Sequence, residues 1–171
     1  MLDSARRLFA ERGYRVPLNA IARDAGVGQG SLYRHFPTRL DLALAIFEDN
    51  YAELERIAEQ DTGLGGFRRL WLRLIELTLE SKAFVELAVD ARRELADSGY
   101  GERLLRILEP PLATAQAAGE VNPQLTVEDL ALVHRMVYGV IVTELDADRA
   151  RSAARRALHL VDQTLSWEES T

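Results

Sequence analysis

The chain has no cysteine, a single lysine, and aromatic residues at only 7% of its 171 positions. Without cysteine it forms no disulfide and has no thiol to act as a nucleophile or a metal ligand. No apolar run approaches the ~20 residues that a membrane span needs. The first fifteen residues lack the layout of a signal peptide. We therefore expect a cytoplasmic protein.

Groups suited to catalysis are equally scarce. The three histidines lie far apart, and neither a glycine-rich phosphate loop nor a metal-ligand spacing is present. An enzyme is therefore not expected, and neither is a metal or another cofactor. His134 and His159 fall in apolar segments, so we expect each to be a hydrogen-bonded histidine of the interior or of an interface.

Hydrophobic residues make up 47% of the chain and charged residues 28%, a composition typical of a globular protein. Nearly every segment has helical periodicity, and none alternates as a strand does. We predict an all-α fold of about nine helices, with capping boxes at Thr38–Asp41 and Thr126–Asp129. One helix is expected at 83–96, a kink or break at Pro110-Pro111, and a last helix from about Asp148 to Trp167.

The charge is unevenly distributed along the chain. Residues 1–47 hold seven arginines and four acids, whereas residues 48–171 hold fourteen basic residues and twenty-three acids. A mildly basic head (1–47) therefore precedes an acidic body (48–171), a division that also fits ordinary scatter of charge. The net charge of −6 argues against a protein that coats nucleic acid without selectivity, but not against local contact with DNA.

The most informative segment is 18–39, where two short helices are joined at Ala25-Gly26-Val27. Gly26 suits a left-handed turn, and this layout is typical of a helix-turn-helix, whose second helix enters the major groove. Gln29 and Ser31 offer hydrogen bonds to base edges or phosphates. Arg39 begins the next helix, where a cation and free N–H groups together suit a phosphate.

Residues 2–47 resemble the DNA-binding domain of TetR-type (TetR/AcrR) transcriptional regulators. The resemblance rests on three stretches of sequence: Phe9-Ala10-Glu11-Arg12-Gly13-Tyr14, Ala25-Gly26-Val27 and Gly30-Ser31-Leu32-Tyr33-Arg34-His35-Phe36-Pro37-Thr38-Arg39. It implies a DNA-binding domain at 1–47 and a ligand-binding and dimerisation domain at 48–171. The chain departs from the family in two ways: Val16-Pro17 replaces the usual Ser or Thr cap, and the basic residues that usually precede the first helix are missing. Either the protein does without that arm or its true start lies upstream.

The resemblance also implies the functional residues. Tyr33 and His35 are expected on phosphate rather than on bases, and Arg34 on phosphate or facing solvent. The expected DNA contacts are Gln29, Gly30, Ser31, Tyr33, Arg34, His35, Thr38 and Arg39. Residues that line a ligand pocket, or alternatively fill a plain core, are Trp71, Ile75, Phe84, Leu87, Tyr100, Leu104, Met136 and Tyr138. Dimer contacts are expected from the last two helices at Val137, Ile141, Ala150, Ala154, Ala157, Leu158 and Val161.

Several charged sets remain open to two interpretations. Glu76/Glu80 and Glu86/Asp90 are spaced to share a helix face, which could anchor a cationic ligand or simply face solvent. Arg155-Arg156 is expected in solvent or in ion pairs.

The resemblance implies a ligand-responsive, homodimeric, DNA-binding regulator, most simply a repressor that a small-molecule effector releases from its operator. The helix from Thr38 to about Gln60 would join head and body and transmit the change. The alternative is a helical interaction module that keeps the helix-turn-helix only as a scaffold.

Overall fold

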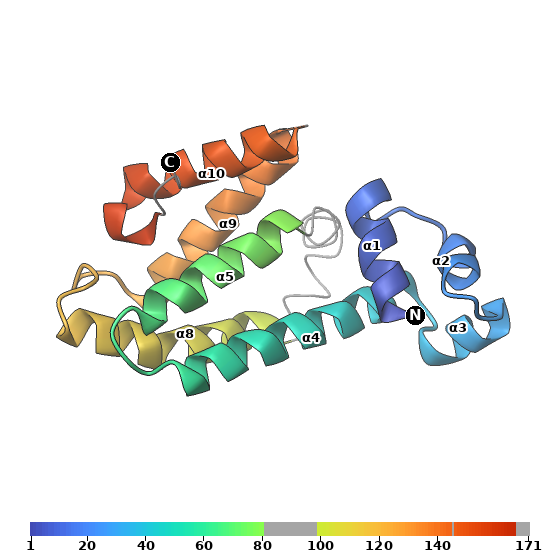
Figure 1. Ribbon diagram of the computed structural model, residues 1–171, viewed down its shortest axis with the longest axis horizontal. Coiled ribbons are helices and arrows are strands. Elements are labelled where there is room, and N and C mark those ends of the chain that lie inside the picture. Colours follow the sequence, from blue (N-terminus) through green and yellow to red (C-terminus); the bar gives the residue numbers. More distant parts are fainter. Residues whose placement is uncertain (81–98, 145, 167–171) are drawn as a thin grey trace.

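The computed structural model describes residues 1–80, 99–144 and 146–166. Every regular element in these ranges is helical, so the all-α prediction is confirmed (Figure 1). The helix expected at 83–96 lies outside the described residues. The elements are α1 (Leu2–Arg12), α2 (Leu18–Asp24), α3 (Gln29–His35), α4 (Arg39–Gln60), α5 (Gly66–Glu80), α8 (Tyr100–Ala117), α9 (Val127–Thr143), α10 (Ala147–Val161) and the 3-10 helix η1 (Gln163–Leu165).

The buried side chains form two hydrophobic clusters. The first joins α1, α2, α3 and the beginning of α4, and its fully buried members include Ile21, Leu32 and Leu42. The second joins the later part of α4 to α5, α8, α9 and α10, around Leu70, Ile75 and Leu130. Figure 1 shows α1–α3 at one end of α4 and the other helices stacked along the rest of it.

The helix α4 belongs to both clusters. It has 22 residues, so it is about 33 Å long at 1.5 Å per residue. Its first turn is fixed by the predicted capping box, which is confirmed: the Asp41 amide donates to Thr38 Oγ1 (3.1 Å), and the Thr38 amide donates to Asp41 Oδ2 (2.8 Å). The second predicted box, Thr126–Asp129, is also confirmed at the start of α9. A single rigid element therefore connects the two cores.

Of the two expected outcomes at Pro110-Pro111, the break is wrong, because α8 runs through both prolines; the kink stays a prediction. Two interior prolines remove two helical hydrogen bonds and crowd the preceding turn. Pro110 is exposed and Pro111 half-buried. Along the same helix, Leu104, Leu108 and Leu112 are buried in the second core. Tertiary packing of these leucines therefore overrides the local preference.

The last helix ends earlier than expected, at Val161 rather than near Trp167. The Asp162 carboxylate accepts the Thr164 amide (2.8 Å) and starts η1. This turn brings Leu165 into the core, where its carbonyl accepts the Trp71 indole N–H at 2.9 Å. None of the described helices is long and apolar enough to cross a membrane.

Candidate nucleic-acid interface and effector site

The turn between α2 and α3 has the predicted conformation. Gly26 has a φ of +66°, and the Val27 amide donates to the Ala22 carbonyl at 3.0 Å. A Cβ on Gly26 would meet nothing within 4 Å, so the turn requires glycine for its backbone angle rather than for space. Cβ atoms on Gly28 and Gly30 would also point into open space. The leading end of α3 is therefore slim on its outer side, with room for a partner.

The outer face of α3 carries the predicted DNA-contact residues. Leu32 is fully buried and fixes the helix on the first core. Ser31 is half-buried beside it, and the Tyr33 side chain is 47% exposed. The other exposed members of this face are Gln29, Gly30, Arg34 and His35. Together they present hydrogen-bond donors, acceptors and one cation on a single surface.

Thr38 has a structural role in this surface. Its hydroxyl donates to Asp41 Oδ2 at 2.7 Å and accepts the Asp41 amide, while its own amide donates to the same carboxylate. Its only hydroxyl proton and its amide proton are therefore both used. The capping box satisfies the backbone N–H of Asp41. The backbone N–H groups of Arg39 and Leu40, at the N-terminus of α4, are left without a helical acceptor.

Arg39, at the start of α4, is held against an aromatic ring. Its guanidinium carbon lies 5.4 Å from the centre of the Tyr14 ring, a cation–π geometry. Its Nε is buried and has no partner among the described residues. Sequence reasoning assigned no role to Tyr14, although Gly13-Tyr14 lies in the segment that carries the resemblance. Tyr14, whose ring holds the Arg39 guanidinium, thus lies 25 residues before Arg39 in the sequence.

The arginines of the head differ in their partners. Arg6 pairs with Asp49 (3.1 Å), and Arg7 pairs with Glu11 and Asp24. Arg34 on α3 and Arg39 at the start of α4 make no ion pair among the described residues. This part of the head therefore carries positive charge of the kind that suits a phosphate.

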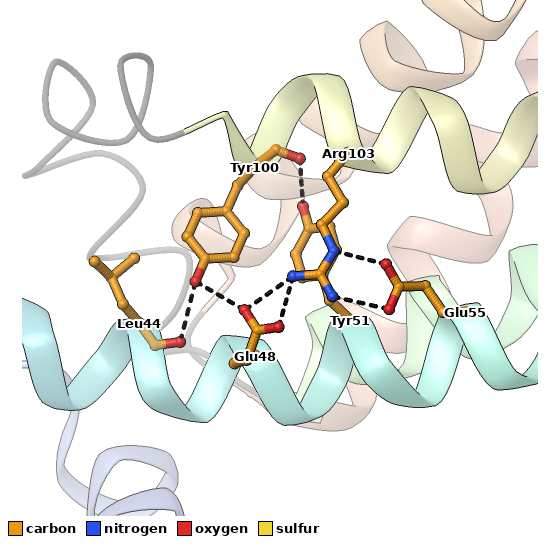
Figure 2. Close-up of polar contacts among 6 residues, drawn as sticks. All are labelled: Leu44, Glu48, Tyr51, Glu55, Tyr100 and Arg103. Atoms are coloured by element: carbon orange, nitrogen blue, oxygen red, sulfur yellow. Dashed lines mark hydrogen bonds and ion pairs between the residues drawn. The ribbon is translucent and has the colours of Figure 1, made fainter.

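A polar cluster, Glu48, Tyr51, Glu55, Tyr100 and Arg103, ties α4 to α8, and we call it the α4–α8 clamp (Figure 2). The Arg103 guanidinium donates to both carboxylate oxygens of Glu55 (2.7 and 2.8 Å) and to Glu48 (2.7 Å). It also lies 5.2 Å from the centre of the Tyr51 ring. The hydrogen bond from Arg103 lowers the pKa of Glu55.

The tyrosines complete the clamp. The Tyr51 hydroxyl donates to the Tyr100 carbonyl at 3.0 Å, and the Tyr100 hydroxyl donates to Glu48 at 3.3 Å. Sequence reasoning missed this cluster. Glu48, Tyr51 and Glu55 do share one face of a predicted helix, but the arginine between the two carboxylates lies 48 residues beyond Glu55.

A cavity of about 30 Å³ lies under α4, beside the clamp. Its polar wall is a buried pair: Thr78 Oγ1 lies 2.8 Å from His134 Nε2. Because the single Thr78 hydroxyl proton goes to the Leu74 carbonyl (2.7 Å), His134 is the donor within the pair. Burial lowers the pKa of His134 to about 4, which keeps it neutral. The lining residues are Phe47, Asn50, Tyr51, Leu54, Leu74, Leu77, Thr78 and His134.

The predicted pocket residues lie elsewhere. Trp71, Ile75 and Leu104 are buried in the second core, and Tyr100 belongs to the clamp. Tyr138 is half-buried, with its ring centre 4.8 Å from that of His134. Met136 is 48% exposed on the outside of α9. Phe84 and Leu87 lie outside the described residues. His134 is the hydrogen-bonded interior histidine expected from the sequence, whereas His159 is exposed in the single chain.

Most predicted dimer residues pack inside their own chain. Val161 is 44% exposed and Ala157 half-buried, but five of the seven are buried: Val137, Ile141, Ala150, Ala154 and Leu158. The small side chains of Ala150 and Ala154 thus let α10 approach α9 closely within one chain. On the outer side of α9 the exposed apolar residues are Leu132, Met136 and Val142. Periodicity could not separate these two faces, because both faces of α9 carry apolar residues.

The charged sets fall mainly on the surface. Glu76 and Glu80 are exposed, and both pair with Arg73 at 3.4 Å, so this face is solvated. Glu86 and Asp90 lie outside the described residues.

Comparisons with known proteins agree with this geometry. Residues 1–46 match the family model described as "Bacterial regulatory proteins, tetR family". The chain is 26% identical over 165 residues to the transcriptional regulator UidR of Escherichia coli, covering 90% of this chain and 84% of that one. It is 29% identical over 168 residues to the transcriptional regulator TtgR of Pseudomonas putida, covering 90% and 72%.

A solved structure shares the fold along the whole chain. The TetR transcriptional regulator SCO0520 of Streptomyces coelicolor superposes with a TM-score of 0.66 at 29% identity, covering 96% of this chain and 95% of that one. Residues 1–46 therefore form a DNA-binding domain of the TetR family, and over most of its length the chain is similar to DNA-binding transcriptional regulators rather than to an enzyme.

Proposed function

We propose that the protein is a homodimeric repressor that a small-molecule effector releases from its operator. The observation that carries this proposal is the position of α4. Its first turns pack in the head around α3, and its later turns pack in the body above the cavity. A change in the cavity therefore reaches the DNA-contact surface through one helix. Residues 1–47 and 48–171 act as the two functional units, and α4 crosses the boundary between them.

The DNA-contact surface supports a division of labour. Gln29 and Ser31 stand near the slim leading end of α3, where side chains can reach base edges. Tyr33, Arg34, His35 and Arg39 serve the phosphates, and Thr38 acts through the capping box that orients the start of α4. Phosphate contacts fix the position of the protein, and base contacts select the sequence.

The cavity under α4 suits a small, mostly apolar effector. Its volume of about 30 Å³ is close to that of one water molecule, so an effector has to enlarge it. Four of its eight lining residues belong to α4: Phe47, Asn50, Tyr51 and Leu54. Enlargement therefore displaces α4 and with it the head. The neutral Thr78–His134 pair offers the effector a hydrogen-bonding group without a charge.

The mechanism is a shift of population between two forms. An effector that fits only the enlarged cavity binds the form whose heads are wrongly spaced for the operator. A difference in binding free energy of ~1–3 kcal/mol between the two forms gives a typical allosteric response. The α4–α8 clamp stabilises the form with the small cavity, because it fixes α4 on α8 at two carboxylates.

Arg103→Met tests this role of the clamp. The substitution removes the ion pairs with Glu48 and Glu55 and keeps an apolar side chain over Tyr51. We expect the free energy of unfolding to fall by about 1 kcal/mol, since the pair is partly exposed, and operator affinity to fall about threefold. Thermal denaturation and fluorescence anisotropy measure the two effects. Arg106→Met is the matched control, because Arg106 reaches only Glu102, at 4.0 Å; equal losses in both variants would contradict the role.

Met136→Lys tests the proposed dimer face, which consists of Leu132, Met136 and Val142 on α9 with Ala157 and Val161 on α10. Two lysines brought together across a two-fold axis repel each other and lose hydration. We expect the dimer dissociation constant to rise at least tenfold in sedimentation experiments. The control is Leu64→Lys, since Leu64 is an exposed apolar residue between α4 and α5. An unchanged Met136→Lys dimer would place the interface elsewhere.

The decisive experiment is binding to DNA from the protein's own upstream region, measured by anisotropy across a salt series against random duplex. We expect selective binding of two protomers to half-sites roughly 34–36 Å apart. An effector screen then follows on that operator. Absence of binding to this region and to a randomised pool would favour the alternative, an interaction module that keeps the helix-turn-helix as a scaffold.

A further inference from the structure

A second, larger pocket lies between α5 and α10, separate from the cavity under α4. Its volume is about 590 Å³. The lining residues come from α5, the outer face of α10 and the turn that follows: Arg68, Ser152, Arg155, Arg156, His159, Leu160, Gln163 and Ser166. None of them lines the cavity under α4. The two sites therefore have different walls and different chemistry.

The charge of this pocket is opposite to that of the chain around it. Three arginines line it, and no acid does so among the described residues, although residues 48–171 have a balance of −9. Some arginines of the body are neutralised in place, since Arg69 pairs with Asp61 and Arg73 pairs with Glu53. Within the described chain, Arg68 and Arg156 form no such pair. The pocket therefore brings two arginines without an ion pair to one site.

The remaining walls supply hydrogen-bond donors. Ser166 is only 8% exposed, and its Oγ lies 3.5 Å from His159 Nδ1 and 3.3 Å from the Gln163 carbonyl. Ser152 adds a hydroxyl, and Gln163 adds an amide. Each guanidinium contributes up to five N–H donors in a planar fork that matches carboxylate and phosphate oxygens. Only Leu160 is apolar, so the lining suits a ligand with several charged oxygens.

The walls are fixed by the core beneath them. The lining residues of α10 lie on the face opposite to the buried Ala154 and Leu158. The turn at Gln163–Ser166 is held by the hydrogen bond from Trp71 to the Leu165 carbonyl. A site whose backbone is already ordered loses little conformational entropy when a ligand binds.

We propose that the pocket between α5 and α10 binds a small polyanion, a phosphate ester or a polycarboxylate, as a second ligand distinct from the effector under α4. The anion neutralises Arg68 and Arg156 and accepts hydrogen bonds from the Ser152 hydroxyl and the Gln163 amide. This site is independent of the effector proposal, because it shares no lining residue with the cavity under α4.

Calorimetric titration of the full-length protein with sodium pyrophosphate, and separately with citrate, tests the proposal at low and constant ionic strength. We expect saturable binding of one anion per chain. Arg68→Gln and Arg156→Gln should each weaken it about three- to tenfold. Arg151→Gln is the matched control, since Arg151 is exposed on the same helix but does not line the pocket.

Three results would overturn the proposal. Unsaturable heats with both anions mean that no site exists. Equal weakening by Arg151→Gln and Arg156→Gln means that the anion responds only to the overall charge of the helix. The third concerns the carboxylates that follow Ser166 in the sequence. If Glu168→Gln combined with Glu169→Gln tightens pyrophosphate binding tenfold or more, the chain's own acids are the anion that this pocket holds.

Discussion

Arg39→Ala should weaken binding to operator and to random duplex alike, by about a hundredfold for the dimer. Each protomer loses one charged hydrogen-bond donor to phosphate, which costs about 1.4 kcal/mol of binding free energy, or about tenfold in affinity. The two protomers of the dimer together lose about a hundredfold. The slope of log affinity against log salt should fall in magnitude by about two, one for each lost phosphate contact. Anisotropy titrations at four or five salt concentrations measure both quantities.

The structure gives a reason for this large effect. Arg39 is already ordered by the Tyr14 ring, 5.4 Å from its guanidinium, so it loses little freedom on binding. Gln29→Ala is the informative comparison. It should lower operator affinity about tenfold and leave random duplex unchanged, because Gln29 serves base edges. Arg151→Ala on α10 controls for the loss of charge alone; equal losses on all sequences for Arg39→Ala and Gln29→Ala would refute the division of labour.

Acidification should destabilise the body through one buried histidine. Burial lowers the pKa of His134 from its ordinary 6.5 to about 4. Between these two values the unfolded chain binds a proton that the folded chain does not, so stability falls as the pH falls. The loss begins near pH 6.5 and is complete near pH 4, where it reaches about 3 kcal/mol. Above pH 6.5 the contribution of His134 is constant.

Denaturant unfolding at half-unit pH intervals measures this loss against a His134→Gln variant. Glutamine keeps a side-chain N–H that can donate to Thr78, but it does not titrate. The carboxylates titrate equally in both proteins, so the difference between the two stability curves isolates His134. We expect that difference to change by about 3 kcal/mol between pH 7 and pH 4. Parallel curves would show that His134 is protonated as easily in the folded protein as in the unfolded chain.

The local features of the head could be predicted from sequence because they depend on neighbours in the chain. A glycine at Gly26 and a threonine three residues before Asp41 each define a turn or a cap through backbone angles and short-range hydrogen bonds. The structure has both. The same local reasoning predicted a kink or break at Pro110-Pro111, and the break is absent, because burial of the apolar residues of α8 outweighs the missing helical bonds.

Contacts between distant residues could not be predicted in this way. The clamp joins Glu55 to Arg103, and the polar wall of the cavity joins Thr78 to His134. Each residue taken alone looks like an ordinary surface charge or a core side chain. Two residues that the sequence places at a dimer interface, Ala154 and Leu158, are apolar as an interface requires, but they are buried within their own chain. The interface itself stays a prediction. Periodicity identifies an apolar face without identifying its partner.

By itself, the sequence determined the helical class and the helix-turn-helix with its turn and caps, because helical period, turn glycines and caps act over a few residues. Only the tertiary structure decided where the cavity under α4 lies, which side of α9 remains exposed, and that Arg68, Arg155 and Arg156 meet in one pocket. Those arrangements depend on how helices far apart in the chain pack against one another. That packing is set by the combined burial of many side chains, and no single segment encodes it.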